Sequence, residues 1–308
     1  MAVTQPIETT TSQRVGTVGL VGLGAMGRGV AANLERDGFQ VFGCDVRPES
    51  RSALGRDARF TTQPAELGPA CDIIVSFVVN DAQTEELLFG AEGAAAAMRR
   101  DSIFVMCSTV PPAYARDLGP RLAERGIVLI DSPVTGGAAG AAKGSLTIMA
   151  SGPKDAFLRV RPVLESFGAR IYHLGEENGA GSQMKVINQL LCGVHLAAAG
   201  EALAMAKRQG LPLETVHEIL CSGSASSWML GDRGPRMVKA DWDTITSAVD
   251  IFVKDTNLVL DAARETGCAV PLTQVANHAF RTVSAGGLGR KDDSAVMRFF
   301  EGQEEETR

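Results

Sequence analysis

The sequence predicts a two-domain protein: an N-terminal α/β domain with a doubly wound parallel sheet, followed by an all-helical C-terminal domain. Three observations support this. A short apolar run leads through a glycine-rich turn into a helical pattern near the start, strand-like and helical stretches then alternate, and only helical stretches follow. Such alternation is typical of a parallel sheet with helices on its faces. A length of 308 residues fits two domains of ordinary size.

The expected boundaries follow from these patterns. Residues 1–14 hold five Ser or Thr residues and no apolar run, so we expect a disordered tail there. Residues 15–177 form the predicted α/β domain. Residues 178–308 form the predicted helical domain, which begins with a long interdomain helix. Neither a signal peptide nor a membrane-spanning run is predicted, and the expected location is therefore the cytoplasm.

Composition excludes several classes of partner. A formal net charge of −6 and a pI near 5.4 give no basic field for nucleic acid or for an anionic membrane. The six cysteines lie far apart, with no CxxC pair and no Cys/His spacing that would build a zinc site. We expect reduced thiols and no metal.

The first element is a buried strand at Gly16–Gly22 that runs into the sequence GLGAMG and then into a helical pattern ending at Gly38. The glycine spacing fits G-x-G-x-x-G, in which the first glycine permits a tight turn, the second lets the backbone approach a pyrophosphate, and the third packs helix against strand. This context predicts a Rossmann dinucleotide site. The expected cofactor contacts in this turn are Gly22, Gly24, Ala25, Met26 and Gly27.

The second strand ends at Asp45, 18 residues beyond Gly27 in the numbering. An acidic side chain at this point accepts hydrogen bonds from the ribose hydroxyls of NAD and repels the 2′-phosphate of NADP. Arg47 is evidence for the other cofactor, because a guanidinium can hold that phosphate. We expect NAD, with NADP as the alternative.

Further strands are predicted at Cys71–Val79, Ser102–Ser108 and Gly126–Pro133. Ligands of open parallel sheets sit beyond the carboxyl ends of the strands. Structural turn residues give the same signal in a sequence. The candidates for cofactor contact at these ends are Val79, Asn80, Ser108 and Thr109.

The loop from Asp131 to Gly152 is rich in glycine and leads into a strand-like LTIMAS segment. Its backbone amides can form a nest for a small anion such as a carboxylate, although an ordinary turn is the plainer interpretation. The candidates for substrate contact in this loop are Ser132, Thr135, Gly136 and Gly137.

A long helix is predicted from Asn178 to Gly210, because this stretch has no proline and ends at a glycine. Lys185 and Asn188 share one face of its first turns. A lone lysine there is ordinarily just solvated. The part between residues 190 and 206 is apolar on nearly every face, so we expect a partner subunit to cover it in a homodimer or homotetramer.

In these motifs the chain resembles the β-hydroxyacid dehydrogenase family, from about Thr17 to Phe300. Three separated segments carry the resemblance: GLGAMG, DSPVTGGAAGA and GAGSQMKVIN. It implies an NAD(P)-dependent enzyme for a small hydroxy acid. Lys185 is then the catalytic general acid and base and Asn188 its amide partner. Asn80, Thr109 and Lys254 fall where the family touches the cofactor.

The expected substrate comes from departures within that pattern. Ser247 stands where many members carry phenylalanine, which favours a polyhydroxy acid over an acid with a methyl group. Segments such as CDVRPE and SAVDIFVKD are similar to members that oxidise L-threonate to 2-oxo-tetronate. Tartronate semialdehyde and 3-hydroxyisobutyrate are the alternative substrates. Trp228 is expected near the substrate cleft or a subunit contact, with a core position as the alternative.

Two other functions compete with this one. A noncatalytic dinucleotide-binding module uses the same fold, and fold alone does not fix function. An imine reductase has a similar architecture. The presence of Lys185 together with Asn188 argues against both.

Overall fold

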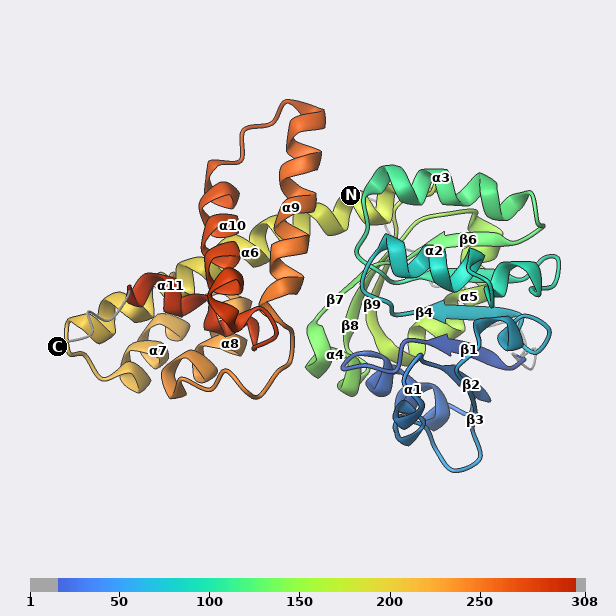
Figure 1. Cartoon of the computed structure of the whole chain (residues 1–308), viewed down its shortest axis with the longest axis horizontal. Coiled ribbons are helices and arrows are strands. Elements are labelled where there is room, and N and C mark those ends of the chain that lie inside the picture. The colour runs from blue at the N-terminus through green and yellow to red at the C-terminus, as the bar shows by residue number, and fades with distance from the viewer. Residues whose placement is uncertain (1–15, 303–308) are drawn as a thin grey trace, which may run out of the picture.

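The structure, a computed structural model, describes residues 16–302, so the tail expected at residues 1–14 lies outside the described residues. Two lobes are joined by one long helix, α6 (Ala180–Arg208) (Figure 1). The first lobe contains every strand of the described part, and the second is built from helices. The predicted fold class is confirmed.

The main sheet contains six strands in the order β3-β2-β1-β4-β5-β6, all parallel. The strand order changes direction between β1 and β4, because β2 and β3 are added on one side of β1 and β4 to β6 on the other. Doubly wound sheets bind ligands at this point. The strands are β1 (Val18–Val21), β2 (Val41–Cys44), β3 (Arg59–Thr61), β4 (Ile73–Ser76), β5 (Ile103–Met106) and β6 (Val128–Asp131).

Helices cover both faces of this sheet and produce two separate cores. Helices α1 (Gly27–Arg36) and α5 (Lys154–Phe167) pack on one face, through residues such as Leu34 and Leu164. Helices α2 (Asp81–Phe89) and α3 (Pro112–Ala123) pack on the other. Short 3₁₀ turns complete this lobe at η1 (Pro48–Ala53), η2 (Pro64–Leu67) and η3 (Ala94–Ala96).

The glycine-rich segment after β6 differs from expectation. It forms β7 (Val134–Thr135) and a short helix, α4 (Gly137–Lys143), before β8 (Leu146–Ala150) and β9 (Gly168–His173) complete a second, three-stranded sheet. Helix α4 is held by α1, where Asn33 Nδ2 donates to Ala141 O at 2.7 Å. A Cβ on Gly29 would lie 2.7 Å from Ala142 N, so the two helices touch through bare backbone. This contact comes from a distant segment, and local sequence could not indicate it.

The helical lobe packs around the second half of α6. Its core includes Leu196 and Leu203 of α6, and Phe252 stacked on Phe280. The other helices are α7 (Leu213–Ser222), α8 (Trp228–Lys239), α9 (Val249–Thr266), α10 (Pro271–Val283), the π turn η4 (Ser284–Leu288), the 3₁₀ turn η5 (Asp293–Val296) and α11 (Met297–Glu301).

One face of α6 stays open to solvent. Helix α6 is long and apolar enough to cross a membrane by length and composition alone. Half of its most apolar stretch is buried inside the protein, as in a core helix. Burial on all sides, expected from the sequence, is therefore not achieved within one chain. The exposed stripe follows helical spacing and consists of Met184, Ile187, Leu191, His195, Ala198, Ala202 and Met205.

A buried carboxylate attaches the start of α6 to the sheet. Asp131, at the end of β6, accepts hydrogen bonds from Gly179 N at 3.1 Å, from Ser182 N at 2.8 Å and from Ser182 Oγ at 2.7 Å. Ser151 Oγ is a further donor at 3.3 Å. The first helix position offers no capping side chain of its own, so Asp131 supplies the cap from another element.

We predict that Asp131→Asn destabilises the protein by about 2–4 kcal/mol, because an amide nitrogen would face N–H donors in a buried site. Thermal and urea unfolding measure the loss. Asp72→Asn is the matched control, since Asp72 is half exposed, and exposed substitutions usually change stability by about 0.5 kcal/mol or less. Equal stability of the two variants would contradict the assignment of Asp131 as the cap.

Candidate active site

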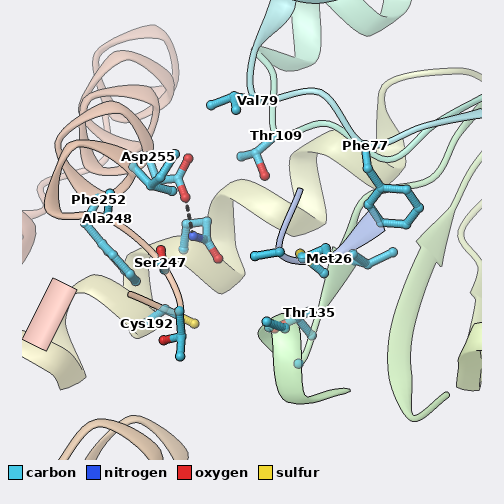
Figure 2. Close-up of a pocket in the computed structure, with 18 of the residues that line it drawn as sticks. Met26, Phe77, Val79, Thr109, Thr135, Cys192, Ser247, Ala248, Phe252 and Asp255 are labelled. Carbon is cyan, nitrogen blue, oxygen red and sulfur yellow. Dashed lines mark hydrogen bonds between the residues drawn. The ribbon is translucent and has the colours of Figure 1, made fainter. Parts of the chain in front are cut away.

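A cavity of about 390 Å³ lies between the two lobes, at the carboxyl ends of β1 and β4. Figure 2 shows side chains converging on it from both lobes, with Thr109 and Thr135 on one side and Ser247 and Asp255 on the other. The sequence-predicted residues that line it are Gly24, Ala25, Met26, Gly27, Val79, Thr109, Thr135, Gly136, Gly137, Lys185, Trp228, Ser247 and Lys254, together with Ser108.

Of the three motif glycines in the turn, only Gly24 leaves room for a ligand. Gly22 has a φ of +84°, and a Cβ there would lie 2.8 Å from Phe77 O. A Cβ on Gly27 would overlap the carbonyl oxygen of Gly22. Above Gly24 the space is open, since the nearest heavy atom would be Arg47 Nη2 at 3.8 Å. The turn therefore fits close approach of a pyrophosphate to the backbone at Gly24.

Lys185 lies in the second turn of α6, and its side chain is buried in the cavity wall. Its Nζ donates to Val134 O at 2.8 Å. Burial lowers the pKa of Lys185 because the charged form loses water; Asp255 opposes this shift and Lys254 adds to it. A lysine with a lowered pKa in a ligand cavity is suited to take up and release a proton.

A carboxylate next to Lys185 connects three elements. Asp255, on α9, accepts from Lys254 Nζ at 2.6 Å and from Gln189 Nε2 on α6. Lys254 Nζ also donates to Thr109 O at 2.9 Å, across the two lobes. Gln189 and Asp255 line the cavity but were not among the predicted site residues. The sequence could have indicated both residues, since Gln189 lies one helical turn after Lys185 and Asp255 directly follows Lys254.

Asn188 occupies a different position from Lys185. It does not line the cavity, and its Nδ2 points to Cys192 Sγ at 3.1 Å. Its Oδ1 is buried and has no hydrogen-bond partner within residues 16–302. Cys192, which the sequence did not single out, lines the cavity in its place.

Four other predicted residues also lie outside the cavity lining. Gly22 shapes the turn, as described. Asn80 caps α2 by accepting from Gln83 N at 2.8 Å. Ser132 is fully buried, and its Oγ has no partner among the described residues. Asp45 lies at the end of β2, beside the glycine turn.

The two residues that bear on the choice of cofactor are bonded to each other. Asp45 accepts from Leu23 N at 2.8 Å, and from the backbone N, Nε and Nη2 of Arg47 at 3.0, 3.1 and 3.2 Å. Burial would raise the pKa of Asp45, but these hydrogen bonds outweigh it and lower the pKa. The Arg47 side chain is 56% exposed, so it can leave without a large energetic cost.

The far wall of the cavity is formed by α8, α9 and the loop between them. Trp228 is 55% exposed, so the core position is wrong, and its Cη2 would lie 3.9 Å from a Cβ on Gly137. Ser247 lines the wall together with Phe252, so a hydrophobic surface persists beside the hydroxyl. Arg233, absent from the predicted residues, lines it too.

Comparison with known proteins identifies the family. Residues 17–175 match the model of the NAD binding domain of 6-phosphogluconate dehydrogenase. Residues 179–300 match the model described as NAD-binding of NADP-dependent 3-hydroxyisobutyrate dehydrogenase. L-Threonate dehydrogenase from Cupriavidus necator is 46% identical over 93% of this chain and 97% of its own. The chain belongs to the 3-hydroxyisobutyrate dehydrogenase family.

Other members of the 3-hydroxyisobutyrate dehydrogenase family extend this comparison. The 2-hydroxy-3-oxopropionate reductase of Escherichia coli K12 is 33% identical, covering 92% of this chain and 97% of the reductase. A crystal structure of 3-hydroxyisobutyrate dehydrogenase from Salmonella typhimurium is 39% identical, with a TM-score of 0.88, covering 92% of this chain and all of that one.

As a family member, the protein is a hydroxyacid dehydrogenase that binds a nicotinamide dinucleotide and a small-molecule substrate. Both matched models describe dinucleotide-binding regions. The open space at Gly24 fits such a cofactor, as does the buried Ser108 Oγ in the cavity wall, which has no partner in the part of the chain that the structure describes.

We predict that the lowered pKa of Lys185 appears in the pH dependence of stability. Above the folded-state pKa the unfolded chain binds the extra proton, so rising pH favours the folded enzyme until the ordinary lysine pKa of about 10.4 is reached. Between pH 7 and 10, the wild type should therefore gain unfolding free energy relative to Lys185→Met. Substitution of the exposed Lys143 by Met controls for the lost charge; parallel curves for wild type and Lys185→Met would refute the shift.

Proposed function

We propose that this dehydrogenase oxidises a hydroxyl group of a small polyhydroxy carboxylic acid, with L-threonate as substrate, 2-oxo-tetronate as product and NAD as oxidant. The observation that carries the proposal is a buried lysine, Lys185, in a cavity whose floor is a glycine turn and whose far wall bears polar groups. The 46% identity to an L-threonate dehydrogenase over nearly the whole chain supports this substrate.

In the proposed reaction the neutral form of Lys185 takes the proton of the substrate hydroxyl. The lowered pKa raises the fraction of that neutral form near neutral pH. A bound nicotinamide supplies the acceptor for the hydride that leaves the same carbon. The carbon–oxygen bond becomes a carbonyl, and both electrons of the broken C–H bond leave with the hydride.

Positioning of the substrate falls to the segment after β6. We assign its carboxylate to Thr135, Gly136 and Gly137, where two successive glycines have positive φ angles of +123° and +63° and expose backbone to the cavity. Asn188 is assigned to orient Lys185 or the reacting oxygen, and its unpartnered Oδ1 supports this role. Ser132 was predicted as a substrate contact; because it is fully buried outside the cavity lining, we propose that it supports the same segment instead.

The cofactor preference rests on Asp45. Its four hydrogen bonds fill the acceptor positions of a carboxylate. Ribose hydroxyls therefore bind there only when the exposed Arg47 side chain withdraws. We propose that it does so for NAD, while Asp45 repels a 2′-phosphate. Asn80, Val79, Thr109 and Lys254 are the remaining proposed cofactor contacts.

We predict that Asp45→Asn lowers the preference for NAD over NADP, measured as a ratio of kcat/KM values, by about tenfold to a hundredfold, the range for loss of charged hydrogen bonds. Asp37→Asn, at an exposed site near the end of α1, is the control. An unchanged ratio would show that Asp45 does not select the cofactor. Loss of activity with NADP in Arg47→Ala would instead favour the alternative, in which Arg47 binds the 2′-phosphate of NADP.

The substrate is tested by steady-state rates with L-threonate, glycerate and 3-hydroxyisobutyrate, each with NAD and NADP. We expect the highest kcat/KM with L-threonate and NAD. Lys185→Ala should reduce turnover at least about a hundredfold with cofactor affinity intact, because general acid–base catalysis contributes about this much. Indifference to L-threonate would refute the substrate, and near-normal turnover of the variant would refute the role of Lys185.

Reduction of tartronate semialdehyde is the second candidate, supported by the 33% identity to a 2-hydroxy-3-oxopropionate reductase. The same cavity would serve it with Lys185 donating a proton instead of accepting one. Rates of NADH oxidation with that aldehyde decide between the two functions.

We also propose that the enzyme is a homodimer or homotetramer in the cytoplasm. The exposed stripe of α6 supports self-association, because seven positions along one helix face lack a cover. The six free cysteines fit a reducing compartment. Light scattering of the purified protein tests association, and a monomer at micromolar concentration would exclude it.

A further inference from the structure

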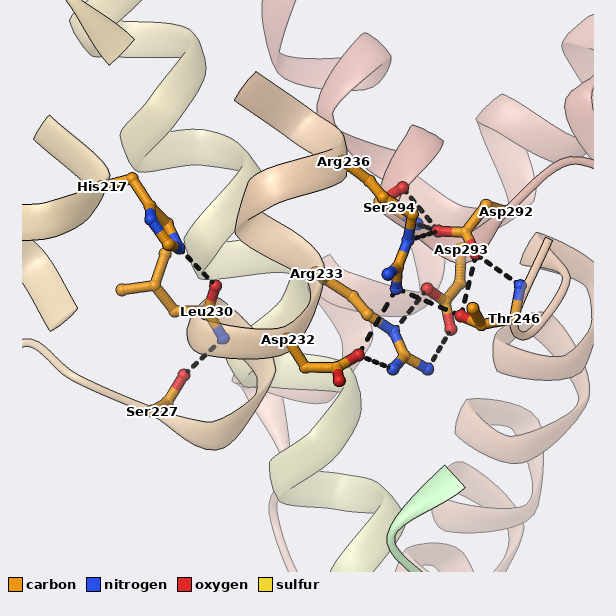
Figure 3. Close-up of polar contacts among 10 residues, drawn as sticks. All are labelled: His217, Ser227, Leu230, Asp232, Arg233, Arg236, Thr246, Asp292, Asp293 and Ser294. Atoms are coloured by element: carbon orange, nitrogen blue, oxygen red, sulfur yellow. Dashed lines mark hydrogen bonds and ion pairs between the residues drawn. The ribbon is translucent and has the colours of Figure 1, made fainter. Parts of the chain in front are cut away.

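A buried ionic cluster lies behind the far wall of the cavity. It consists of Asp232, Arg233 and Arg236 on α8 and of Asp292 and Asp293 at the start of η5, and we call it the Arg233 cluster. Figure 3 shows the guanidinium of Arg233 held between Asp232 and Asp293. The proposed mechanism uses none of these residues.

The guanidinium of Arg233 is held by two aspartates but keeps N–H groups that could bind a ligand. Its Nε and Nη2 donate to the two oxygens of Asp293 at 2.9 and 3.0 Å, and its Nη1 donates to Asp232. A guanidinium has five N–H groups, so the hydrogen bonds within residues 16–302 leave one N–H on each terminal nitrogen. Arg233 is only 6% exposed, yet it lines the cavity. A buried cation with spare donors thus lies at the wall of a ligand site.

Trp228 relates the position of Arg233 to the segment proposed to hold the substrate carboxylate. The ring centroid of Trp228 is 5.7 Å from Arg233 Cζ, and its Cη2 would be 3.9 Å from a Cβ on Gly137. A substrate whose carboxylate is anchored at Gly136 and Gly137 can therefore extend its remaining carbons past Trp228 toward Arg233.

The charge of the cluster selects the kind of group that Arg233 can bind. Two arginines face three aspartates, so the cluster carries a formal net charge of −1, although Asp232 and Arg236 are partly exposed. A second carboxylate on the substrate would be repelled by this negative charge. A hydroxyl oxygen accepts the same hydrogen bonds without that penalty.

The cluster also fixes the loop that carries Ser247. Asp292 accepts from Thr246 N at 2.9 Å and from Thr246 Oγ1 at 3.0 Å. The backbone N of Asp293 donates to Ser247 O at 2.8 Å. The wall facing the substrate is therefore rigid, and rigid donors discriminate better between substrates than mobile ones do.

We propose that Arg233 determines substrate specificity by donating hydrogen bonds to a hydroxyl remote from the substrate carboxylate, and that Asp293 is the positioning residue for its guanidinium. This inference rests on the proposed oxidation of a polyhydroxy acid. It identifies the Arg233 guanidinium as the group that binds the additional hydroxyl. A site built to bond a hydroxyl rejects an analogue that lacks it, because the buried donors are then left unpaired.

The test compares L-threonate with its two deoxy analogues, 2,3-dihydroxybutanoate and 2,4-dihydroxybutanoate, which lack the hydroxyl on carbon 4 and carbon 3. The wild type should favour L-threonate over at least one analogue by about a hundredfold or more in kcat/KM. The ratio of kcat/KM for L-threonate to kcat/KM for that analogue should shrink at least about tenfold in two variants. These are Arg233→Lys and the double variant Arg233→Met with Asp293→Asn. The double variant avoids an unpaired buried aspartate.

Arg236→Lys is the matched control, because Arg236 belongs to the same cluster but does not line the cavity. Its ratio should stay at the wild-type value even if its melting temperature falls. Equal losses on all three acids in the Arg233 variants, or a wild type that does not discriminate, would overturn the inference. A wild type that leaves L-threonate unreacted would instead refute the proposed function itself.

Discussion

The hydrogen bonds of Asp131 to the first turn of α6 are the constraint on which the rest of the site depends. The carboxylate ends the last strand of the main sheet and binds Gly179 and Ser182 directly. Gly181 packs so closely on the backbone of β6 and β8 that a Cβ would not fit. Lys185 follows one turn later, and its position relative to the sheet is therefore set before its side chain makes any contact.

Burial then suits that lysine to the proton transfer that we propose for it. The same packing that removes water from Lys185 lowers its pKa, while Asp255, held by Gln189 and Lys254, keeps the charged form accessible. Discrimination between substrates is assigned to a different part of the chain, the Arg233 cluster. The residues proposed for proton transfer and for recognition are thus far apart in the sequence and meet at the cavity.

Local patterns predicted the elements to which we assign cofactor binding and proton transfer. The glycine spacing after β1 fixed a turn, and helical periodicity put Lys185 near the start of a long helix, because both depend on neighbours in the chain. The bond from Asn188 to Cys192, the formation of α4 and the placement of Arg233 were not predictable in the same way. Arg233 lines the cavity with its guanidinium held by Asp293, which lies 60 residues away.

The attachment of α6 has a consequence for release of the product. Its first turns are bonded to the sheet at Asp131 and Val134, while its later turns form the core of the helical lobe. If the lobes hinge apart along the middle of this helix, Lys185 travels with the nucleotide half and Arg233 with the other. The amine would then keep its place beside the nucleotide site while the helical lobe moves away, so that the oxidised acid and the reduced nucleotide can both be exchanged.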